Sequence, residues 1–405
     1  MKRVLLLLPS STYRAGDFLD AAAELGAEVI VASDSEQAMA SSMGDRALQL
    51  PRGQREAAAA IVEHARRTPI DAVVAVDDQG VVPAALASAD LGLPHNSHDA
   101  VSTTRDKSGL RRALEGQVPQ PRFRVAEPGA DVGDLAEEIG FPVVVKPVSL
   151  SASRGVIRAD DAAAARKAAD RIREILRCAD ERTDGPLLVE EFVPGAEVAV
   201  EGLLRDGEVE ILAVFDKPDP LDGPYFEETI YVTPSRQPPE ILDRIAAVTR
   251  RAIEVTGLVE GPIHAELRID PGNGEVRFLE IAARSIGGLC ARALRFGLGV
   301  RLEELILRHA LGMSLDGMRR EPDASGVMML PIPRAGVLEE VGGQEAAREV
   351  PGIVGLQITV PRGREVEPLP EGDRYLGFLF ARGETPQDVE ASLREAHARL
   401  DVAIS

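Results

Sequence analysis

The most informative stretch of the sequence is Gly261-Pro262-Ile263-His264-Ala265-Glu266-Leu267-Arg268-Ile269, followed after a short link by Val276-Arg277-Phe278-Leu279-Glu280-Ile281-Ala282-Ala283-Arg284. Both segments are apolar or alternate between apolar and polar residues, which predicts two β-strands. The link, residues 270–275, reads Asp-Pro-Gly-Asn-Gly-Glu and consists of typical turn residues. We therefore expect the two strands to pair as a hairpin.

Each strand of this hairpin carries one carboxylate among apolar neighbours, Glu266 on the first and Glu280 on the second. Two neighbouring buried carboxylates repel each other unless a positive group lies between them, and Mg²⁺ bound to phosphates can supply that charge. The pair therefore suggests a metal site. Two glutamates on a solvated face of the sheet are the alternative, and this stretch alone does not decide between them.

The composition limits the classes of partner. A net charge of −20 argues against binding to nucleic acid or to an anionic membrane, because both require a basic face. The sequence contains no tryptophan and 3% aromatic residues, which argues against a surface that stacks on bases. An anionic nucleotide is still compatible with this charge, provided that a local cluster of lysine, arginine and metal holds it.

The N-terminal segment and the cysteines bear on location. The apolar run at residues 4–8 is short and no small-residue cleavage site follows it, so it predicts a first buried strand rather than a signal peptide. No run is long enough to cross a bilayer. Cys178 and Cys290 lie far apart and lack metal-binding spacing, which fits a reducing compartment. We expect a cytoplasmic protein.

The chain of 405 residues is long enough for two or three domains. In residues 1–98, short apolar strands at 4–8, 28–32 and 71–76 alternate with alanine-rich helices at 16–25, 54–67 and 79–89. This alternation predicts an α/β domain with a doubly wound parallel sheet. Its first loop, residues 9–13, lacks G-x-G-x-x-G, so a dinucleotide site is poorly supported and we expect this domain to supply one wall of a cleft.

The rest of the chain predicts two further domains. Residues 99–312 contain a smaller lobe at about 122–190, with the order strand, helix, strand, loop, strand, helix, strand. Two hairpin-like strand pairs then surround a helix at 239–255, and helices are expected at 289–296 and 302–311. Residues 313–405 are predicted to be α+β, with strands near 326–330 and 356–360 and a final amphipathic helix at 386–400.

A strand ending at Lys146 runs into a loop of small residues, among them Ser149, Ser151, Ser153 and Gly155. Such a loop can bring backbone N–H groups and hydroxyls close to phosphate oxygens, and the lysine adds a positive charge for the same phosphates. An ordinary hairpin turn is the alternative.

A second strand, at residues 187–193, leads into an acidic turn. It ends with Glu190, Glu191, Phe192 and Val193, and Glu197 follows a Pro-Gly pair. The backbone of such a strand can pair with an adenine edge, and Glu197 can then accept hydrogen bonds from ribose hydroxyls. A solvated acidic turn is the alternative.

Taken in order, these pieces form a set that resembles the ATP-grasp superfamily over the whole chain. The set is Lys107, Lys146, the Ser/Gly loop, Glu190 to Val193, Glu197, Glu266, Glu280 and Arg284. Within that superfamily, the segments at 279–288 and 326–353 are most similar to the bacterial L-amino acid ligases, which make dipeptides. The resemblance implies a pre-ATP-grasp domain at 1–98, a two-lobed ATP-grasp domain at 99–312 and a C-terminal domain at 313–405.

The resemblance also implies roles for individual residues. Lys107, Lys146 and the loop from Ser149 to Gly155 would hold the ATP phosphates, Glu190 to Val193 the adenine, and Glu197 the ribose. Glu266 and Glu280 would bind one or two Mg²⁺ ions, or Mn²⁺ in their place. Arg284 would meet the carboxylate or acyl phosphate of the first substrate. Ser285, Gly287 and Gly288 would hold an anionic group through backbone N–H donors.

The chain departs from the superfamily at one position. Many ATP-grasp enzymes have asparagine two residues after the second metal-binding glutamate, where this chain has Ala282. The amino acid ligases also tend to lack that asparagine, so the departure favours this subgroup. It leaves the number of metal ions open.

Several residues are candidates for the substrates. His264 lies two residues before Glu266 on the same strand face, where it can act as general base toward the amine or, as we favour, make a supporting hydrogen bond. Lys217, Tyr225 and Glu228 belong to a polar loop that would line the acceptor pocket, although an ordinary surface loop explains it equally well. Arg334 would reach the same cleft from the C-terminal domain.

The expected activity is an ATP-dependent ligation of a carboxylate and an amine, between two amino acids or near analogues, through an acyl phosphate. A carboxylase or purine-pathway ligase on the same scaffold is the alternative, and a catalytically silent ATP-binding protein is a third. Small-molecule amino acid or carboxylate substrates are the expected partners, and the resemblance allows a homodimer.

Overall fold

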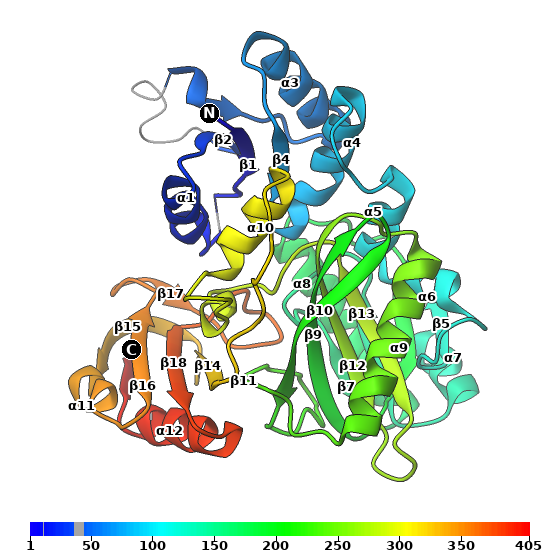
Figure 1. Ribbon diagram of the computed structural model, residues 1–405. Helices are drawn as coiled ribbons and strands as arrows, with labels where there is room; N and C mark the ends of the chain where they lie inside the picture. The colour runs from blue at the N-terminus through cyan, green and yellow to red at the C-terminus, as the bar shows by residue number, and fades with distance from the viewer. Residues whose placement is uncertain (11, 36–43) are drawn as a thin grey trace.

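The computed structural model describes residues 1–10, 12–35 and 44–405, so that Ser11 of the first loop lies outside the described residues. The N-terminal α/β domain lies at the top of Figure 1, the two lobes of the central region lie on the right, and the C-terminal segment lies at the lower left. Within the described residues, no helix combines the length and the apolar character that crossing a membrane would require.

The N-terminal domain is built on a parallel sheet, as the alternating pattern predicts. Strand β1 (Arg3–Leu7) lies between β2 (Glu28–Ser33) and β4 (Ala72–Ala75), and β3 (Ala47–Gln49) pairs with β2 at the edge. The helices are α1 (Ala15–Glu24), α3 (Gln54–Arg67) and α4 (Val81–Leu91). Strand β3 was not predicted, since three residues are too few to carry a periodic pattern.

The smaller lobe of the central region follows the predicted order of elements. Its sheet has the order β5 (Phe123–Ala126), β8 (Leu187–Glu191), β6 (Val143–Pro147), β7 (Ile157–Ala159), and it packs against α7 (Val132–Ile139) and α8 (Ala162–Cys178). Two helices, α5 (His98–Arg105) and α6 (Lys107–Leu114), lead into this lobe. The Asp106 side chain accepts a hydrogen bond from Ser108 N and so caps α6.

The larger lobe and the C-terminal region share one eight-stranded sheet. Its order is β13 (Val276–Ala282), β12 (Gly261–Ile269), β9 (Ala196–Arg205), β10 (Glu208–Lys217), β11 (Ile230–Thr233), β14 (Ala324–Leu330), β18 (Gly377–Gly383) and β16 (Ile353–Ile358). Helix α9 (Pro239–Thr256) packs on the β12–β13 end of this sheet. The sheet therefore continues across the domain boundary expected at residue 313.

The remaining C-terminal elements form a small layer beside this sheet. Strand β15 (Gly336–Gly342) lies between β17 (Glu365–Val366) and β19 (Asp401–Ile404). Helix α12 (Pro386–Ala398) packs on β14 and β18 of the large sheet, and helix α11 (Gln344–Arg348) packs on β16. Thr385 and Asp388 form a capping box at the start of α12. This mixture of strands and helices agrees with the α+β class predicted for the segment.

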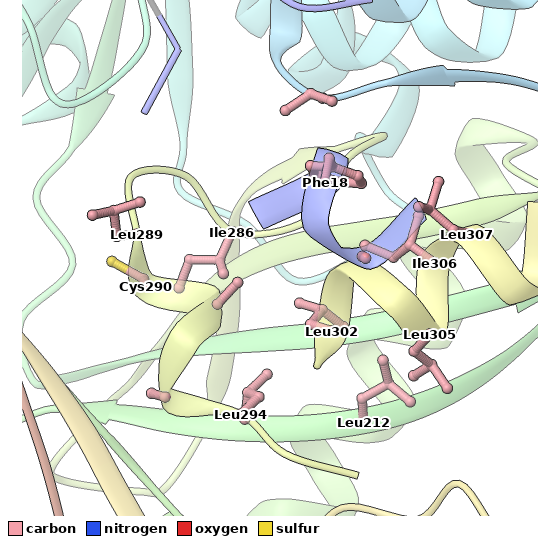
Figure 2. Close-up of a cluster of buried hydrophobic side chains, with 14 of the residues drawn as sticks. Phe18, Leu212, Ile286, Leu289, Cys290, Leu294, Leu302, Leu305, Ile306 and Leu307 are labelled. Atoms are coloured by element: carbon pink, nitrogen blue, oxygen red, sulfur yellow. The ribbon is translucent and has the colours of Figure 1, made fainter. Parts of the chain in front are cut away.

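The regions are joined by one apolar cluster, shown in part in Figure 2. Phe18 of α1 lies beside Leu302, Ile306 and Leu307 of α10 (Leu302–Ala310), and Leu212 of β10 belongs to the same cluster. These side chains are nearly or fully buried. The N-terminal domain is thus packed directly against the chain that follows β13.

The helix predicted at residues 289–296 is wrong. Only a 3-10 turn, η3 (Cys290–Ala293), forms there. Gly288 has a φ of +59° before the turn, and Leu294 is already extended after it. The apolar residues that suggested a helix are buried because the segment lies inside the cluster shown in Figure 2.

Candidate active site

One cavity of about 360 Å³ collects most of the residues that the sequence singled out. It lies where the N-terminal domain, both central lobes and the C-terminal region meet. The predicted residues in its walls are Lys107, Lys146, Ser151, Ser153, Glu190, Glu191, Phe192, Val193, Glu197, Glu228, His264, Glu266, Glu280, Arg284, Gly287 and Gly288.

The predicted hairpin is confirmed. Strands β12 and β13 pair antiparallel with Glu266 directly opposite Glu280, and the register shifts between Glu266 and Leu267. Directly paired residues of neighbouring strands point to the same face of the sheet, so both carboxylates reach the cavity. A β-bulge of this kind re-aims side chains and is frequent beside active sites.

The first predicted lysine, Lys107, lies beside the second carboxylate of the hairpin. Lys107 Nζ lies 3.4 Å from Glu280 Oε1 and donates a hydrogen bond of 2.6 Å to Leu150 O. Lys107 thereby ties the start of α6 to the loop after β6. This contact brings the first predicted lysine and the predicted phosphate loop together.

The second predicted lysine is buried in an ion-pair network. Lys146 Nζ lies 2.6 Å from Glu190 Oε2, and Arg111 Nε lies 2.5 Å from the other oxygen of the same carboxylate. Burial lowers the pKa of Lys146, although Glu190 opposes the effect. Burial would raise the pKa of Glu190, but Arg111 and Lys146 outweigh it and lower that pKa. The carboxylate of Glu190 is thus shared by two cationic side chains.

Glu197, the predicted ribose acid, is held by two cations. It pairs with Lys217 at 2.7 Å and with Arg268 at 2.8 Å. Arg268 also donates to Val193 O at 2.6 Å and lies 5.2 Å from the centre of the Phe192 ring. The predicted hinge residues are thus fixed to the sheet by Arg268, which the sequence reading missed.

Lys217 does not line the cavity but lies behind its wall. Its ammonium contacts three carboxylates, Glu197, Glu228 and Glu266, whose oxygens lie within 4.8 Å of one another. Burial would lower the pKa of Lys217, but these carboxylates raise it well above the usual value. Tyr231 donates a hydrogen bond of 2.7 Å to the second oxygen of Glu228.

His264 is fixed between two carboxylates. Its Nδ1 lies 2.5 Å from Glu201 Oε1, and its Nε2 lies 3.4 Å from Glu266 Oε1. Burial lowers the pKa of His264, but Glu201 more than compensates and raises it to about 9. An imidazole that is already protonated at neutral pH cannot accept a proton, which supports the hydrogen-bonding role rather than that of a general base.

Arg284 follows β13 and meets the N-terminal domain. Its Nη2 donates a hydrogen bond of 2.8 Å to Asp78 Oδ2, and its Nη1 donates one of 3.0 Å to Ser285 O. Asp78 lies on η2 (Asp78–Gly80), directly before α4, and its other oxygen lies 3.3 Å from Arg105 Nη1. The N-terminal domain therefore supplies one wall of the cleft, as expected.

Besides Lys217, two further predicted acceptor residues lie outside the cavity wall. The Tyr225 ring packs under the Arg171 guanidinium of α8, which also bonds to its hydroxyl, so it faces the lobe rather than the cavity. Arg334 is exposed on the turn after β14. Among the described residues, Ser149, Gly155 and Ser285 are also absent from the cavity wall, whereas neighbours of each line it.

The sequence reading missed several residues of the site, chiefly Asp78, Glu201 and Arg111. Asp78 lies beyond the carboxyl end of a parallel strand, where α/β proteins commonly place functional loops, and this position could have identified it. Glu201 lies between the apolar or small residues 198–200 and 202–204 of β9, which is a second usable signal. Arg111 lies on a short helix and carries no such signal.

The donor set fits a hard divalent cation. Glu266 and Glu280 offer carboxylate oxygens on one face, and the Glu280 side chain is 35% exposed. Mg²⁺ prefers such oxygen ligands and takes one or two carboxylates together with phosphate oxygens. The cluster of Glu197, Glu228 and Glu266 is already neutralised in part by Lys217, so the pair formed by Glu266 and Glu280 is the better candidate.

Comparisons with known proteins agree with this arrangement. The ATP-grasp N-terminal domain matches residues 19–95, the ATP-grasp domain matches residues 139–293, and the L-amino acid ligase C-terminal domain 2 matches residues 328–405.

Characterised relatives include several ligases. Over 274 aligned residues, the chain is 27% identical to the alanine–anticapsin ligase of Bacillus subtilis. The aligned region covers 63% of this chain and 57% of that ligase. It is 29% identical over 308 residues to the phosphoribosylamine–glycine ligase of Leifsonia xyli, covering 71% of the chain and 70% of that protein. The chain therefore spans little more than half the length of the alanine–anticapsin ligase.

Solved structures extend the likeness in fold to the whole chain. An L-amino acid ligase from Bacillus licheniformis superposes with a TM-score of 0.81 at 23% identity, over 100% of this chain and 99% of that one. N5-carboxyaminoimidazole ribonucleotide synthetase from Thermotoga maritima gives 0.74 at 16% identity, over the full length of both. With its three matched domains in this order, the chain belongs to the ATP-grasp superfamily and carries the C-terminal domain of the L-amino acid ligases.

Proposed function

We propose that this protein is an ATP-dependent carboxylate–amine ligase that forms an amide bond between two amino acids through an acyl phosphate. One observation supports this above all: two lysines, two facing carboxylates and an arginine line the same cavity. The matched C-terminal domain and the alanine–anticapsin ligase relatives support an amino acid as substrate.

In the proposed reaction, a carboxylate oxygen of the first substrate attacks the γ-phosphorus of ATP, and ADP leaves. The amine of the second substrate then attacks the acyl carbon, loses a proton, and phosphate leaves. Phosphoryl transfer of this kind demands mainly positioning and neutralisation of charge. Lys107 and Lys146 would neutralise the phosphates, and Arg284 would orient the carboxylate and then the acyl phosphate.

Glu190 to Val193 and Glu197 are proposed to bind the nucleoside. Ser151 and Ser153, with the neighbouring residues Ser149 and Gly155, would close over the phosphates, and Gly287 and Gly288 would offer backbone N–H groups to an anion. Glu266 and Glu280 would hold Mg²⁺, which when bound neutralises the charge between the phosphates. His264, already protonated, would fix the orientation of Glu266.

The wider proposals follow from the same likeness. We also propose domain boundaries at residues 98 and 312, a homodimer and a cytoplasmic location. A carboxylase or purine-pathway ligase is the second candidate, since synthetases of that kind share the fold.

A matrix of the common amino acids, read out by phosphate release with mass analysis of the products, tests the proposal. We expect ATP turnover to require one or two amino acids and to yield a dipeptide. Glu280→Ala should lower turnover by about 100-fold or more, with an unchanged melting temperature because the side chain is partly exposed. Turnover that requires bicarbonate instead would favour the second candidate, and normal activity of Glu280→Ala would contradict the metal assignment.

A further inference from the structure

We propose that Asp78 of the N-terminal domain is a positioning residue for the first substrate, because it fixes the guanidinium of Arg284. This inference rests on the proposed function, in which Arg284 meets the substrate carboxylate. In this proposal, the N-terminal domain not only forms one wall of the cavity but also orients the arginine that binds the substrate carboxylate.

The contact between the two residues is buried and well directed. Arg284 Nη2 lies 2.8 Å from Asp78 Oδ2, and each side chain is only 14% exposed. The second hydrogen bond of Arg284 goes to Ser285 O at 3.0 Å. A guanidinium carries five N–H donors. The hydrogen bonds to described residues use two of them, which leaves donors for a ligand in the cavity.

Asp78 is itself held from the other side. Its Oδ1 lies 3.3 Å from Arg105 Nη1 at the end of α5. Burial alone would raise the pKa of Asp78, but Arg284 and Arg105 lower it far below its usual value. One carboxylate is thus shared by two arginines. The two arginines and the one carboxylate together carry one net positive charge, so Asp78 alone does not neutralise both arginines.

Asp78 and Arg284 belong to two domains that are packed firmly together, which explains why their contact is rigid. Asp78 follows β4 at the carboxyl end of the parallel sheet, whereas Arg284 follows β13 in the large sheet. The two domains are packed together through the cluster shown in Figure 2. A side chain held in this way keeps its direction without a bound substrate, which reduces the cost of orienting the carboxylate.

The test compares Asp78→Asn with Asp17→Asn as a matched control. Asp17 of α1 also joins the N-terminal domain to the chain after β13, through hydrogen bonds of 2.8 and 3.0 Å to Arg292. Among the described residues, neither Asp17 nor Arg292 lines the cavity. Both variants lose one interdomain carboxylate, so they differ chiefly in whether that carboxylate holds Arg284.

The measurements use the full chain with the amino-acid pair that gives the fastest phosphate release. For Asp78→Asn we expect kcat/KM for the activated amino acid to fall about 10- to 100-fold, with the KM for ATP within about 3-fold of wild type. For Asp17→Asn we expect both parameters to stay within about 3-fold. An unchanged kcat/KM in Asp78→Asn, or a parallel rise in the KM for ATP, would overturn the inference.

A second variant keeps the test decisive if Asp78→Asn fails to fold. Arg105→Gln removes only the ion pair between Arg105 and Asp78, and the Arg105 side chain is 28% exposed. We expect a selective rise of about 3-fold in the KM for the activated amino acid, and an unchanged KM would contradict the proposal. If wild-type protein shows no turnover that depends on a carboxylate, the proposed function itself fails, and this inference fails with it.

Discussion

At the scale of single residues, Lys217 is a buried lysine whose ammonium is shared by three carboxylates. Its side chain is 3% exposed and contacts Glu197, Glu228 and Glu266. Removing one member of a buried ion-pair group costs far more than removing an exposed pair, because the remaining charges stay buried without compensation. Lys217 therefore holds the acidic side of the site together.

We predict that Lys217→Met lowers the free energy of unfolding by about 3–5 kcal/mol. Denaturant unfolding measures the change. The matched control is Lys2→Met, which breaks the exposed pair of Lys2 with Asp71 and should cost less than about 1 kcal/mol. Equal costs for the two variants would show that Lys217 is not a structural counter-ion.

His264 gives a prediction for pH dependence. Its pKa in the folded chain is raised to about 9, because Glu201 stabilises the imidazolium. A raised pKa adds stability that is complete below about pH 6.5 and is lost as the pH rises through about 9. In metal-free protein, unfolding free energy should therefore fall by roughly 2–3 kcal/mol over that range.

The slope should be much smaller in His264→Gln, which has no titrating ring at that position. The chain contains six histidines, so the ring signal that disappears from the NMR spectrum of the variant identifies His264. A wild-type ring that titrates near pH 6.5 would contradict the raised pKa, and an identical slope in both proteins would assign the pH dependence to another group.

At the scale of elements, ion pairs and hydrogen bonds connect the smaller lobe to the C-terminal segment. Arg171 of α8 forms two contacts with the Glu371 carboxylate, at 2.5 and 2.9 Å, and Arg154 Nε donates to Glu371 O at 2.8 Å. Gly155 N donates to Pro370 O at 3.0 Å. Asp373 and Tyr375, shortly after Glu371, line the cavity. The loop that is proposed to bind the phosphates and the C-terminal wall of the cavity are thus in direct contact.

We predict that Arg171→Ala loosens this connection without unfolding the protein. The pair is partly exposed, so its loss should cost no more than about 1 kcal/mol globally. Hydrogen exchange should become faster in residues 151–156 and 368–376, whereas exchange in the N-terminal sheet should be unchanged. Arg166→Ala, which breaks a pair with Asp131 in the same lobe, is the control. Unchanged exchange at 368–376 would show that the fastening is not formed in solution.

At the scale of the whole molecule, structure formed within one short segment is predictable from the sequence, whereas contacts between residues far apart in the chain are not. The Glu266–Glu280 hairpin is predicted by alternation and a turn within one short segment. The contact of Arg284 with Asp78 joins residues 206 positions apart, and no pattern in one sequence reports such a distance. The helix prediction for residues 289–296 was wrong for a related reason. A segment that is buried on all sides has the same apolar composition whether it forms a helix or an irregular turn.

The resemblance to a superfamily supplied what local patterns could not, namely that separated lysines and carboxylates share a cavity. It did not indicate that Lys217 lies behind the wall or that Tyr225 faces Arg171, because these placements depend on packing between lobes. The resemblance also did not predict that the large sheet continues through β14 and β18 into the C-terminal region.

In the proposed reaction, the chain activates a carboxylate as an acyl phosphate. The most direct test supplies amino acids labelled with ¹⁸O in the carboxylate, together with ATP and Mg²⁺, and measures the mass of the released phosphate. We predict that each phosphate released with peptide formation carries one ¹⁸O atom, transferred from the carboxylate when the acyl–oxygen bond breaks. Phosphate without label, released at the same rate, would contradict the account.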